Sequence, residues 1–258
     1  MKIATWNVNE CIGITCDLDN QETRDKININ NINEIISIIN DNDFDIIAFQ
    51  EYPTYVSENL SLTDEIISKT NLKYFVDNTT YDSFLFKGGK VGVAIFSKYE
   101  IIESTISLFG NPHMVKVGKD GSINRSFDKG IIKITINKDG DNYSFITGHA
   151  MAFAPFGKTE FDYPESYKPL EELINSSLGE KLVVLGDFNT EELFKIIPSI
   201  SGELYDTVDF TTTKDYYEKR GEVHMDYILI NNFFKKVKSY KIDNYSDHYV
   251  VVSEVDAM

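Results

Sequence analysis

Apolar residues recur along the chain with two different periods, and each period predicts a different kind of element. Spacings of three and four residues place Ile32, Ile35, Ile36 and Ile39 on one face of a helix. The segment Tyr167–Leu178 repeats this helical pattern. Short, continuous apolar runs instead predict buried strands, which are Lys2–Trp6, Asp45–Phe49, Leu182–Leu185, Met225–Ile230 and Val250–Val255.

The middle of the chain changes to a two-residue period with frequent turn residues, which predicts a block of hairpins. We expect a helix at Val56–Thr70 before this block and a long polar loop at Gly110–Gly130 within it. The strands expected here are Lys73–Val76, Ser83–Phe86, Val91–Ser97, Ile101–Leu108, Ile131–Ile136 and Tyr143–Thr147. Helices alternate with strands on both sides of the block, which indicates an α/β protein with mixed sheets covered by helices.

Polar residues interrupt the apolar pattern where strands end or begin. Those that follow strands are Asn7, Glu51, His149, Asp187 and Asn189, and those that stand at strand starts are Asp226, Asp247 and His248. An antiparallel strand brings its start to the edge where its neighbour ends. If all these residues are to meet, the last two strands must run opposite to the first four. The sequence therefore predicts a mixed sheet with one polar rim.

The residue types at this rim indicate a particular chemistry. So many like charges are tolerable only beside a cation. Because oxygen ligands are present without thiolates, the sequence favours Mg²⁺ or Mn²⁺ over zinc. A hard cation next to histidine–carboxylate pairs is suited to the hydrolysis of phosphoesters. Each residue also has an ordinary structural explanation, such as an Asx turn at Asp187. No single structural need explains the whole ordered set, so we favour the catalytic interpretation.

Composition limits the class of protein further. The chain has 258 residues and shows no linker, repeat or low-complexity tract, so we expect one domain and a monomer. Its 25 Lys and Arg against 41 Asp and Glu give a net charge of −16, whereas a nucleic-acid binder that worked through charge alone would be basic. Cys11 and Cys16 lack the partners that a zinc site or a disulfide framework needs. No apolar stretch has the length of a signal peptide or a membrane span, which predicts a cytoplasmic protein.

The polar residues belong to motifs that occur in the order typical of the endonuclease/exonuclease/phosphatase superfamily, which the chain resembles over its whole length. The motifs are Thr5-Trp6-Asn7-Val8-Asn9, Phe49-Gln50-Glu51, Gly148-His149, Gly186-Asp187-Phe188-Asn189, Met225-Asp226-Tyr227-Ile228 and Ser246-Asp247-His248. The resemblance implies the deoxyribonuclease-I-like fold, a four-layered α/β sandwich in which two mixed sheets pack face to face with helices outside.

The resemblance also implies a metal site and a histidine dyad. Glu51 is then the main Mg²⁺ ligand, helped by Asn7 and Asp247. His248, oriented by Asp226, lies next to the scissile phosphate. A hydrogen bond between these two side chains requires that their strands be close neighbours in one sheet.

Four further residues complete the site that the resemblance implies. Asp187 aligns or deprotonates the attacking water, and Asn189 contacts the substrate and stabilises the charged transition state. His149 is a phosphate-oxygen ligand or an acid, and Arg125 resembles a phosphate-contacting arginine of the deoxyribonuclease branch. His224 lacks such support and is left out of the chemistry.

The substrate remains open between classes. His149 stands where abasic-site endonucleases of the family generally carry a tyrosine, which counts against base-excision repair. The deoxyribonuclease, sphingomyelinase, inositol-phosphatase and tyrosyl-phosphodiesterase branches share the histidine. We favour a Mg²⁺-dependent nuclease. The alternative is a phosphatase or phosphodiesterase on an inositol phosphate or a phospholipid head group, and a catalytically silent binding module is the third candidate.

Two surfaces would discriminate a nuclease from a lipid enzyme. A nuclease needs basic residues near the rim, and the Gly110–Gly130 loop offers Lys116, Lys119, Arg125 and Lys129. A lipid enzyme would instead expose an apolar loop, for which Met151–Phe156 with Phe161 and Tyr163 is the candidate.

Overall fold

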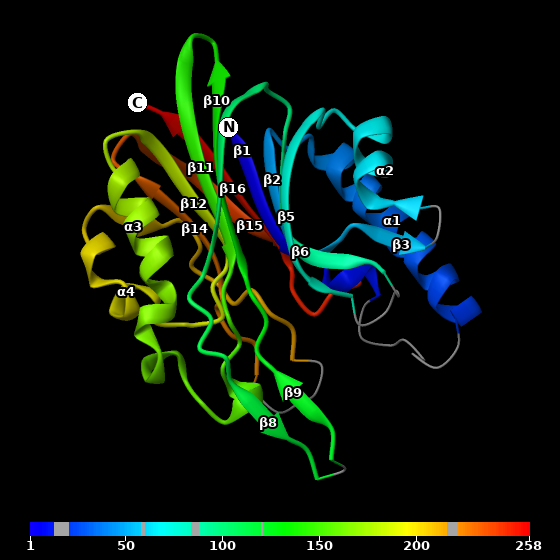
Figure 1. The fold of residues 1–258 in the computed structure, drawn as a ribbon. Coiled ribbons are helices and arrows are strands. Elements are labelled where there is room, and N and C mark those ends of the chain that lie inside the picture. The colour runs from blue at the N-terminus through cyan, green and yellow to red at the C-terminus, as the bar shows by residue number, and fades with distance from the viewer. Residues whose placement is uncertain (13–20, 58–59, 84–87, 120, 216–220) are drawn as a thin grey trace.

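Two large mixed sheets pack face to face, and helices cover their outer sides (Figure 1). The computed structural model describes residues 1–12, 21–57, 60–83, 88–119, 121–215 and 221–258. This arrangement confirms the four-layered α/β sandwich expected from the sequence.

The first sheet joins the two ends of the chain. Its order is β15 (Phe234–Ile242), β16 (Val250–Ala257), β1 (Lys2–Asn7), β2 (Ile46–Pro53), β6 (Lys90–Ser97) and β5 (Tyr74–Asp82). β1 pairs with β2 in parallel and with β16 in antiparallel orientation. The carboxyl ends of β1 and β2 and the amino end of β16 therefore share one edge.

The second sheet repeats this pattern. Its order is β13 (Leu204–Asp206), β14 (Asp226–Asn231), β12 (Lys181–Asp187), β11 (Asp141–His149), β10 (Gly130–Lys138) and β7 (Ile101–Leu108). β11 and β12 are parallel, and β14 runs antiparallel to β12. The predicted strand directions are thus confirmed. The single mixed sheet deduced from them is wrong, because the polar rim is shared by two sheets.

Helices lie on both outer faces. Those over the first sheet are α1 (Gln21–Asn42) and α2 (Leu62–Lys69), and those over the second are α3 (Lys168–Ser177) and α4 (Leu193–Ile196) (Figure 1). Short 3-10 helices are η1 (Asn9–Cys11), η2 (Ala154–Phe156), η3 (Glu160–Asp162), η4 (Pro164–Tyr167) and η5 (Pro198–Ile200). Among helices in the described ranges, none has the length and apolar character needed to cross a membrane.

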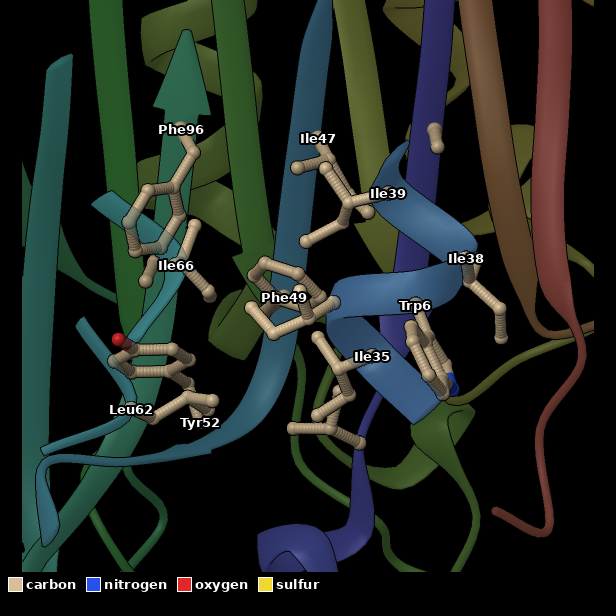
Figure 2. Close-up of a cluster of buried hydrophobic side chains, with 14 of the residues drawn as sticks. Trp6, Ile35, Ile38, Ile39, Ile47, Phe49, Tyr52, Leu62, Ile66 and Phe96 are labelled. Atoms are coloured by element: carbon tan, nitrogen blue, oxygen red, sulfur yellow. The ribbon is translucent and has the colours of Figure 1, made fainter. Parts of the chain in front are cut away.

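The two-residue period of the strands divides the core into layers. In β2, Ile46 and Ala48 face the second sheet, whereas Ile47 and Phe49 face the helices. Figure 2 shows the outer layer, in which Phe49 and Trp6 pack against side chains of α1. Because both faces of the central strands are buried, these strands carry nearly continuous apolar runs.

Three predicted elements need correction or qualification. The sequence predicted one helix over Val56–Thr70, but β3 (Tyr55–Ser57) and β4 (Leu60–Ser61) occupy its first part. α2 starts only at Leu62, where the Ser61 side chain caps it by accepting a hydrogen bond from the Asp64 amide at 3.3 Å. The Gly110–Gly130 loop contains a hairpin of β8 (Val115–Val117) and β9 (Ile123–Arg125). The expected strand Ser83–Phe86 falls mostly on residues 84–87, outside the described ranges, as does Cys16.

Candidate active site

The polar strand ends of both sheets meet at one end of the sandwich, the lower end in Figure 1. A cavity of about 540 Å³ opens there. The predicted site residues that line it are Asn7, Glu51, His149, Asp187, Asn189, Asp247 and His248. Asp226 lies behind His248, and Arg125 is not among the lining residues. The structure thus places most of the residues that the sequence proposed for the site around one cavity.

Close approach of two strands positions Asp187 and His149. Gly186 has φ of +147°, and a Cβ there would lie 2.3 Å from the carbonyl oxygen of Gly148. Only glycine fits this contact. The parallel register then sets His149 beside Asp187, at adjacent ends of β11 and β12.

Asp226 and His248 form a buried pair. His248 Nδ1 lies 2.8 Å from Asp226 Oδ2. Burial alone would lower the pKa of His248, but the carboxylates of Asp226 and Asp187 raise this pKa well above its ordinary value. His248 is therefore held as an imidazolium at neutral pH, with Nε2–H directed toward Asp187 Oδ2 at 3.8 Å.

Asp187 lies between the two histidines. Its Oδ2 accepts a hydrogen bond from Asn7 Nδ2 at 3.1 Å and lies 3.6 Å from His149 Nε2. Its Oδ1 accepts the Asn189 amide hydrogen at 2.9 Å. Burial raises the pKa of Asp187 to about 7, against a lowering by the charge of His248. A carboxylate of this pKa is suited to general-base catalysis near neutral pH.

His149 is held in the opposite protonation state to His248. Its Nδ1 lies 3.2 Å from Lys129 Nζ, and an ammonium group can only donate, so Nδ1 accepts and the proton resides on Nε2. Burial and the charges of Lys129 and His248 lower the pKa of His149 well below its usual value. A neutral His149 therefore presents Nε2–H to the cavity, where it can donate to an oxygen of a substrate.

A strand irregularity places Glu51 at the cavity. The pairing of β2 with β6 shifts register between Gln50 and Tyr52, and Glu51 has φ of +49°. Such a bulge redirects one side chain out of the regular alternation. The strained backbone conformation costs of the order of 1–3 kcal/mol and is typical of functional positions.

Glu51, Asn7 and Asp247 offer oxygen ligands to one cavity, as the sequence predicted for a hard cation. A second group of potential ligands, Asp187, Asp226 and His248, has its atoms within 4.8 Å of one another. An imidazolium has no free lone pair for a metal, so the state of His248 favours the dyad over a metal site among these three.

Of the four basic residues that the sequence offered near the rim, Lys129 is the one that lies at the candidate site. It lines the cavity, and its ammonium lies 4.8 Å from the ring centroid of Tyr81. Burial lowers its pKa, although the charges of Glu51 and Asp187 act to raise it. Arg125, by contrast, is exposed on β9. The sequence offered Lys129 as a basic residue for a polyanionic substrate, and its contact with His149 was not predicted.

Two further expectations can be compared with the structure. The apolar surface expected from Met151–Phe156 with Phe161 and Tyr163 is exposed only in part. Met151 and Phe153 are buried in the core of the second sheet, whereas Ala154 and Pro155 are exposed and Phe161 is 53% exposed. His224 lies outside the site, in a larger cavity of about 620 Å³. There its Nε2 pairs with Asp206 Oδ2 at 2.9 Å, so its omission from the chemistry agrees with its position.

Comparisons with known proteins agree with this fold. The model of the endonuclease/exonuclease/phosphatase family matches residues 4–248. A curated relative, sphingomyelinase C 1 of Leptospira interrogans, is 29% identical over 158 residues, which cover 54% of this chain and 25% of that protein. The chain thus spans about a quarter of that relative's length.

Solved structures share the fold at low identity. A family protein from Leptotrichia buccalis superposes with a TM-score of 0.66 at 19% identity, covering 99% of both chains. A mannosyl-6-phosphatase from Bacteroides thetaiotaomicron does so with a TM-score of 0.64 at 14% identity, also over 99% of both chains. With the family model matched over nearly the whole sequence, this chain belongs to the endonuclease/exonuclease/phosphatase family, whose members are phosphoesterases.

Proposed function

We propose that this chain is a divalent-metal-dependent phosphodiesterase. The observation that carries the proposal is the position of Asp187, buried between His149 Nε2 at 3.6 Å and His248 Nε2 at 3.8 Å. A carboxylate with a pKa of about 7 thus lies between two N–H donors of different charge. A base and two groups that can donate hydrogen bonds to phosphoryl oxygens therefore surround one point in the cavity.

The residues present fit a divalent cation, Mg²⁺ or Mn²⁺. Glu51, Asn7 and Asp247 would hold it, because they supply hard oxygen ligands on one side of the cavity. When bound, the cation polarises a phosphoryl oxygen and offsets the charge of the carboxylates around it.

The protein groups would then act around the reacting phosphate. Asp187 accepts a proton from water as the water oxygen forms a bond to phosphorus. The bond from phosphorus to the leaving oxygen breaks, and that oxygen takes up a proton from solvent, to which Asp187 afterwards returns its own. His248 and His149 donate hydrogen bonds to the phosphoryl oxygens as negative charge accumulates there, and Asn189 supports them from the cavity wall. Asp226 holds the His248 ring in place and stabilises its charge.

For the substrate we favour a phospholipid head group over nucleic acid. Among the described residues that line the cavity, the carboxylates Glu51, Asp187, Asp215 and Asp247 outnumber the lysines Lys129 and Lys214, so this lining is not basic as a site for a polyanion would be. The curated relative is named a sphingomyelinase. A nuclease is the second candidate, supported by Lys129 in the cavity and by the exposed Arg125 on β9.

A side-by-side assay tests the proposal. The purified protein is incubated with Mg²⁺ and one substrate at a time. The substrates are a choline-headgroup phospholipid in detergent micelles, plasmid DNA, RNA and inositol phosphates. We expect release of the phosphorylated head group that EDTA abolishes and that the variant Asp187→Asn lacks. Turnover of DNA or RNA alone would establish the nuclease instead, and turnover of none would refute the catalytic proposal.

A further inference from the structure

The β8–β9 hairpin projects from the body of the protein at the end where the candidate active site opens (Figure 1). Val117 pairs with Ile123 and Val115 pairs with Arg125 across the two strands. Directly paired residues lie on the same face of a hairpin, as do residues two apart in one strand. One face therefore carries Val115, Val117, Ile123 and Arg125.

This face is turned to solvent. Val115, Val117 and Ile123 are 52%, 66% and 59% exposed. The opposite face carries Lys116 and Asn124, which are also exposed, and Lys116 Nζ donates a hydrogen bond to the carbonyl oxygen of Pro155 at 2.5 Å. Three aliphatic side chains on a short projecting hairpin form an apolar surface that the described part of the protein does not cover.

The base of the hairpin is fixed relative to the cavity. Ser126 N donates to the carbonyl oxygen of Met114 at 3.0 Å, and Ser126 Oγ donates to Asn111 Oδ1 at 2.7 Å. Asn111 Nδ2 in turn donates to Asp128 Oδ1 at 2.8 Å. Asp128 directly precedes Lys129, which lines the cavity. Whatever binds the hairpin is therefore held next to the mouth of the site.

Size and charge indicate what the surface binds. A stable protein interface buries about 800 Å² on each partner, far more than three aliphatic side chains provide. Besides Lys116, which bonds to Pro155, the segment from Val115 to Arg125 contains Lys119 and Arg125 against one aspartate, in a chain with a net charge of −16. Aliphatic side chains flanked by cations suit a lipid bilayer, where the apolar groups enter the interface and the cations meet lipid phosphates.

We propose that the face formed by Val115, Val117, Ile123 and Arg125 is a docking surface for phospholipid membranes that contain anionic lipid. Docking there turns the mouth of the catalytic cavity toward the membrane. The role of this docking in catalysis rests on the proposed phosphodiesterase function, whereas membrane binding itself does not require turnover.

Vesicle binding measures the docking directly. Co-sedimentation is performed with vesicles of phosphatidylcholine alone and of phosphatidylcholine mixed with phosphatidylserine. We expect wild-type protein to bind the mixed vesicles more strongly, and Val117→Ser/Ile123→Ser to lose about tenfold or more in partitioning. The matched control is Val237→Ser/Ile102→Ser, which removes side chains of 54% and 51% exposure from other strands and should bind like wild type. Equal loss in both double variants would overturn the proposal.

A fluorescent probe reports insertion at the hairpin itself. The chain has one tryptophan, Trp6, which is buried in the core, so Val117→Trp adds a reporter at the surface. Its emission should shift to shorter wavelength with mixed vesicles and be quenched by brominated lipid. An unchanged spectrum with bound vesicles would place the contact elsewhere and refute the assignment. If the hairpin instead bound a second copy of the chain, wild type would dimerise without lipid and Val117→Ser/Ile123→Ser would not. That result would also overturn the proposed membrane-docking surface.

Activity assays separate this inference from the proposed function. Val117→Ser/Ile123→Ser should hydrolyse a small soluble phosphodiester at the wild-type rate and lose activity only on vesicle substrate. Vesicle binding through the hairpin without hydrolysis of any phosphodiester would support the docking surface while refuting the catalytic proposal. Hydrolysis of vesicle lipid at equal rates by wild type and Val117→Ser/Ile123→Ser would refute the docking surface while leaving the catalytic proposal intact.

Discussion

His248 and Asp226 hydrogen-bond to each other from opposite sheets of the sandwich, with 2.8 Å between Nδ1 and Oδ2. His248 precedes β16 in the first sheet, and Asp226 begins β14 in the second. The sequence predicted this pair but required neighbouring strands in one sheet, and that requirement is wrong. The pair instead depends on the packing of the two sheets against each other.

The dyad should act as one unit in catalysis. We expect His248→Ala to lower kcat by about 10³-fold or more, because it removes the charged donor nearest to Asp187. Asp226→Asn keeps the shape of the partner without its charge and should cost less. The double variant should turn over a chromogenic phosphodiester no more slowly than His248→Ala alone. Losses that multiply would indicate two independent roles.

Stability provides an independent readout of the same pair. His248→Ala leaves the fully buried Asp226 carboxylate without its partner. Removal of one partner from a buried ion pair typically costs about 3–5 kcal/mol. The double variant with Asp226→Asn should recover part of this free energy of unfolding in urea titrations while remaining inactive. A double variant less stable than His248→Ala would contradict the buried-charge explanation.

The rim could be predicted because its signal is local. Asn7, Glu51 and Asp187 interrupt apolar runs that are themselves clear, and the direction of each strand follows from which end carries the polar residue. The division into two sheets had no such signal. It is fixed by contacts between strands far apart in the chain, such as the packing of Ile46 against the second sheet.

The contacts of Lys129 and the exposure of the hairpin were unpredictable for a related reason. Lys129 could be named from the sequence as a basic residue near the rim, but its contacts with the distant Tyr81 and His149 have no local signal. Val117 and Ile123 alternate with polar residues as an ordinary strand would, and only the fold shows that their face is uncovered. Burial and exposure at these positions are set by tertiary contacts rather than by local pattern.

Glu51 should be the centre of cation binding. Glu51→Gln removes one charge and keeps the shape, so we expect Mg²⁺ affinity measured by calorimetry to fall by about 10–100-fold and activity to fall with it. The matched control is Glu103→Gln, an exposed carboxylate on β7 that should retain wild-type affinity. Full activity of Glu51→Gln, or turnover of the wild type in excess EDTA, would exclude the proposed metal site.

Asp187 should make the metal-free protein less stable as pH rises. Burial raises its pKa to about 7, so between pH of about 4 and 7 the folded state retains a proton that the unfolded state has lost. The contribution of Asp187 to the free energy of unfolding therefore decreases with pH across this window, whereas the lowered pKa of His149 contributes in the opposite direction. Asp187→Asn should remove this slope, raise stability near pH 8 by about 1–2 kcal/mol and abolish turnover.

Urea titrations in EDTA across this pH range provide the measurement. Asp77→Asn is an informative comparison, because burial also raises the pKa of Asp77 although this residue is not among those that line the cavity. It should reduce the slope while leaving turnover intact. A difference in stability between wild type and Asp187→Asn that stays constant from pH 5 to 7 would contradict the assignment of the raised pKa to Asp187.

Lys129 should act on the chemistry, and Arg125 only on large anionic substrates. Lys129→Met keeps the apolar stem over Tyr81 but removes the donor that fixes the proton of His149 on Nε2. We expect kcat for a small chromogenic phosphodiester to fall by about 10–100-fold, as for other residues that orient a catalytic group. Lys235→Met, which removes an exposed charge on β15, is the matched control and should be silent. Arg125→Ala should leave turnover of the small substrate unaffected and raise KM only for nucleic acid, with a weaker salt dependence.

Nuclear magnetic resonance of the His149 ring nitrogens adds a readout for Lys129→Met that lost packing alone would not produce. In wild type the proton should be found on Nε2, and in Lys129→Met the two tautomers should both be populated. Unchanged kcat and an unchanged tautomer in Lys129→Met would remove Lys129 from the site.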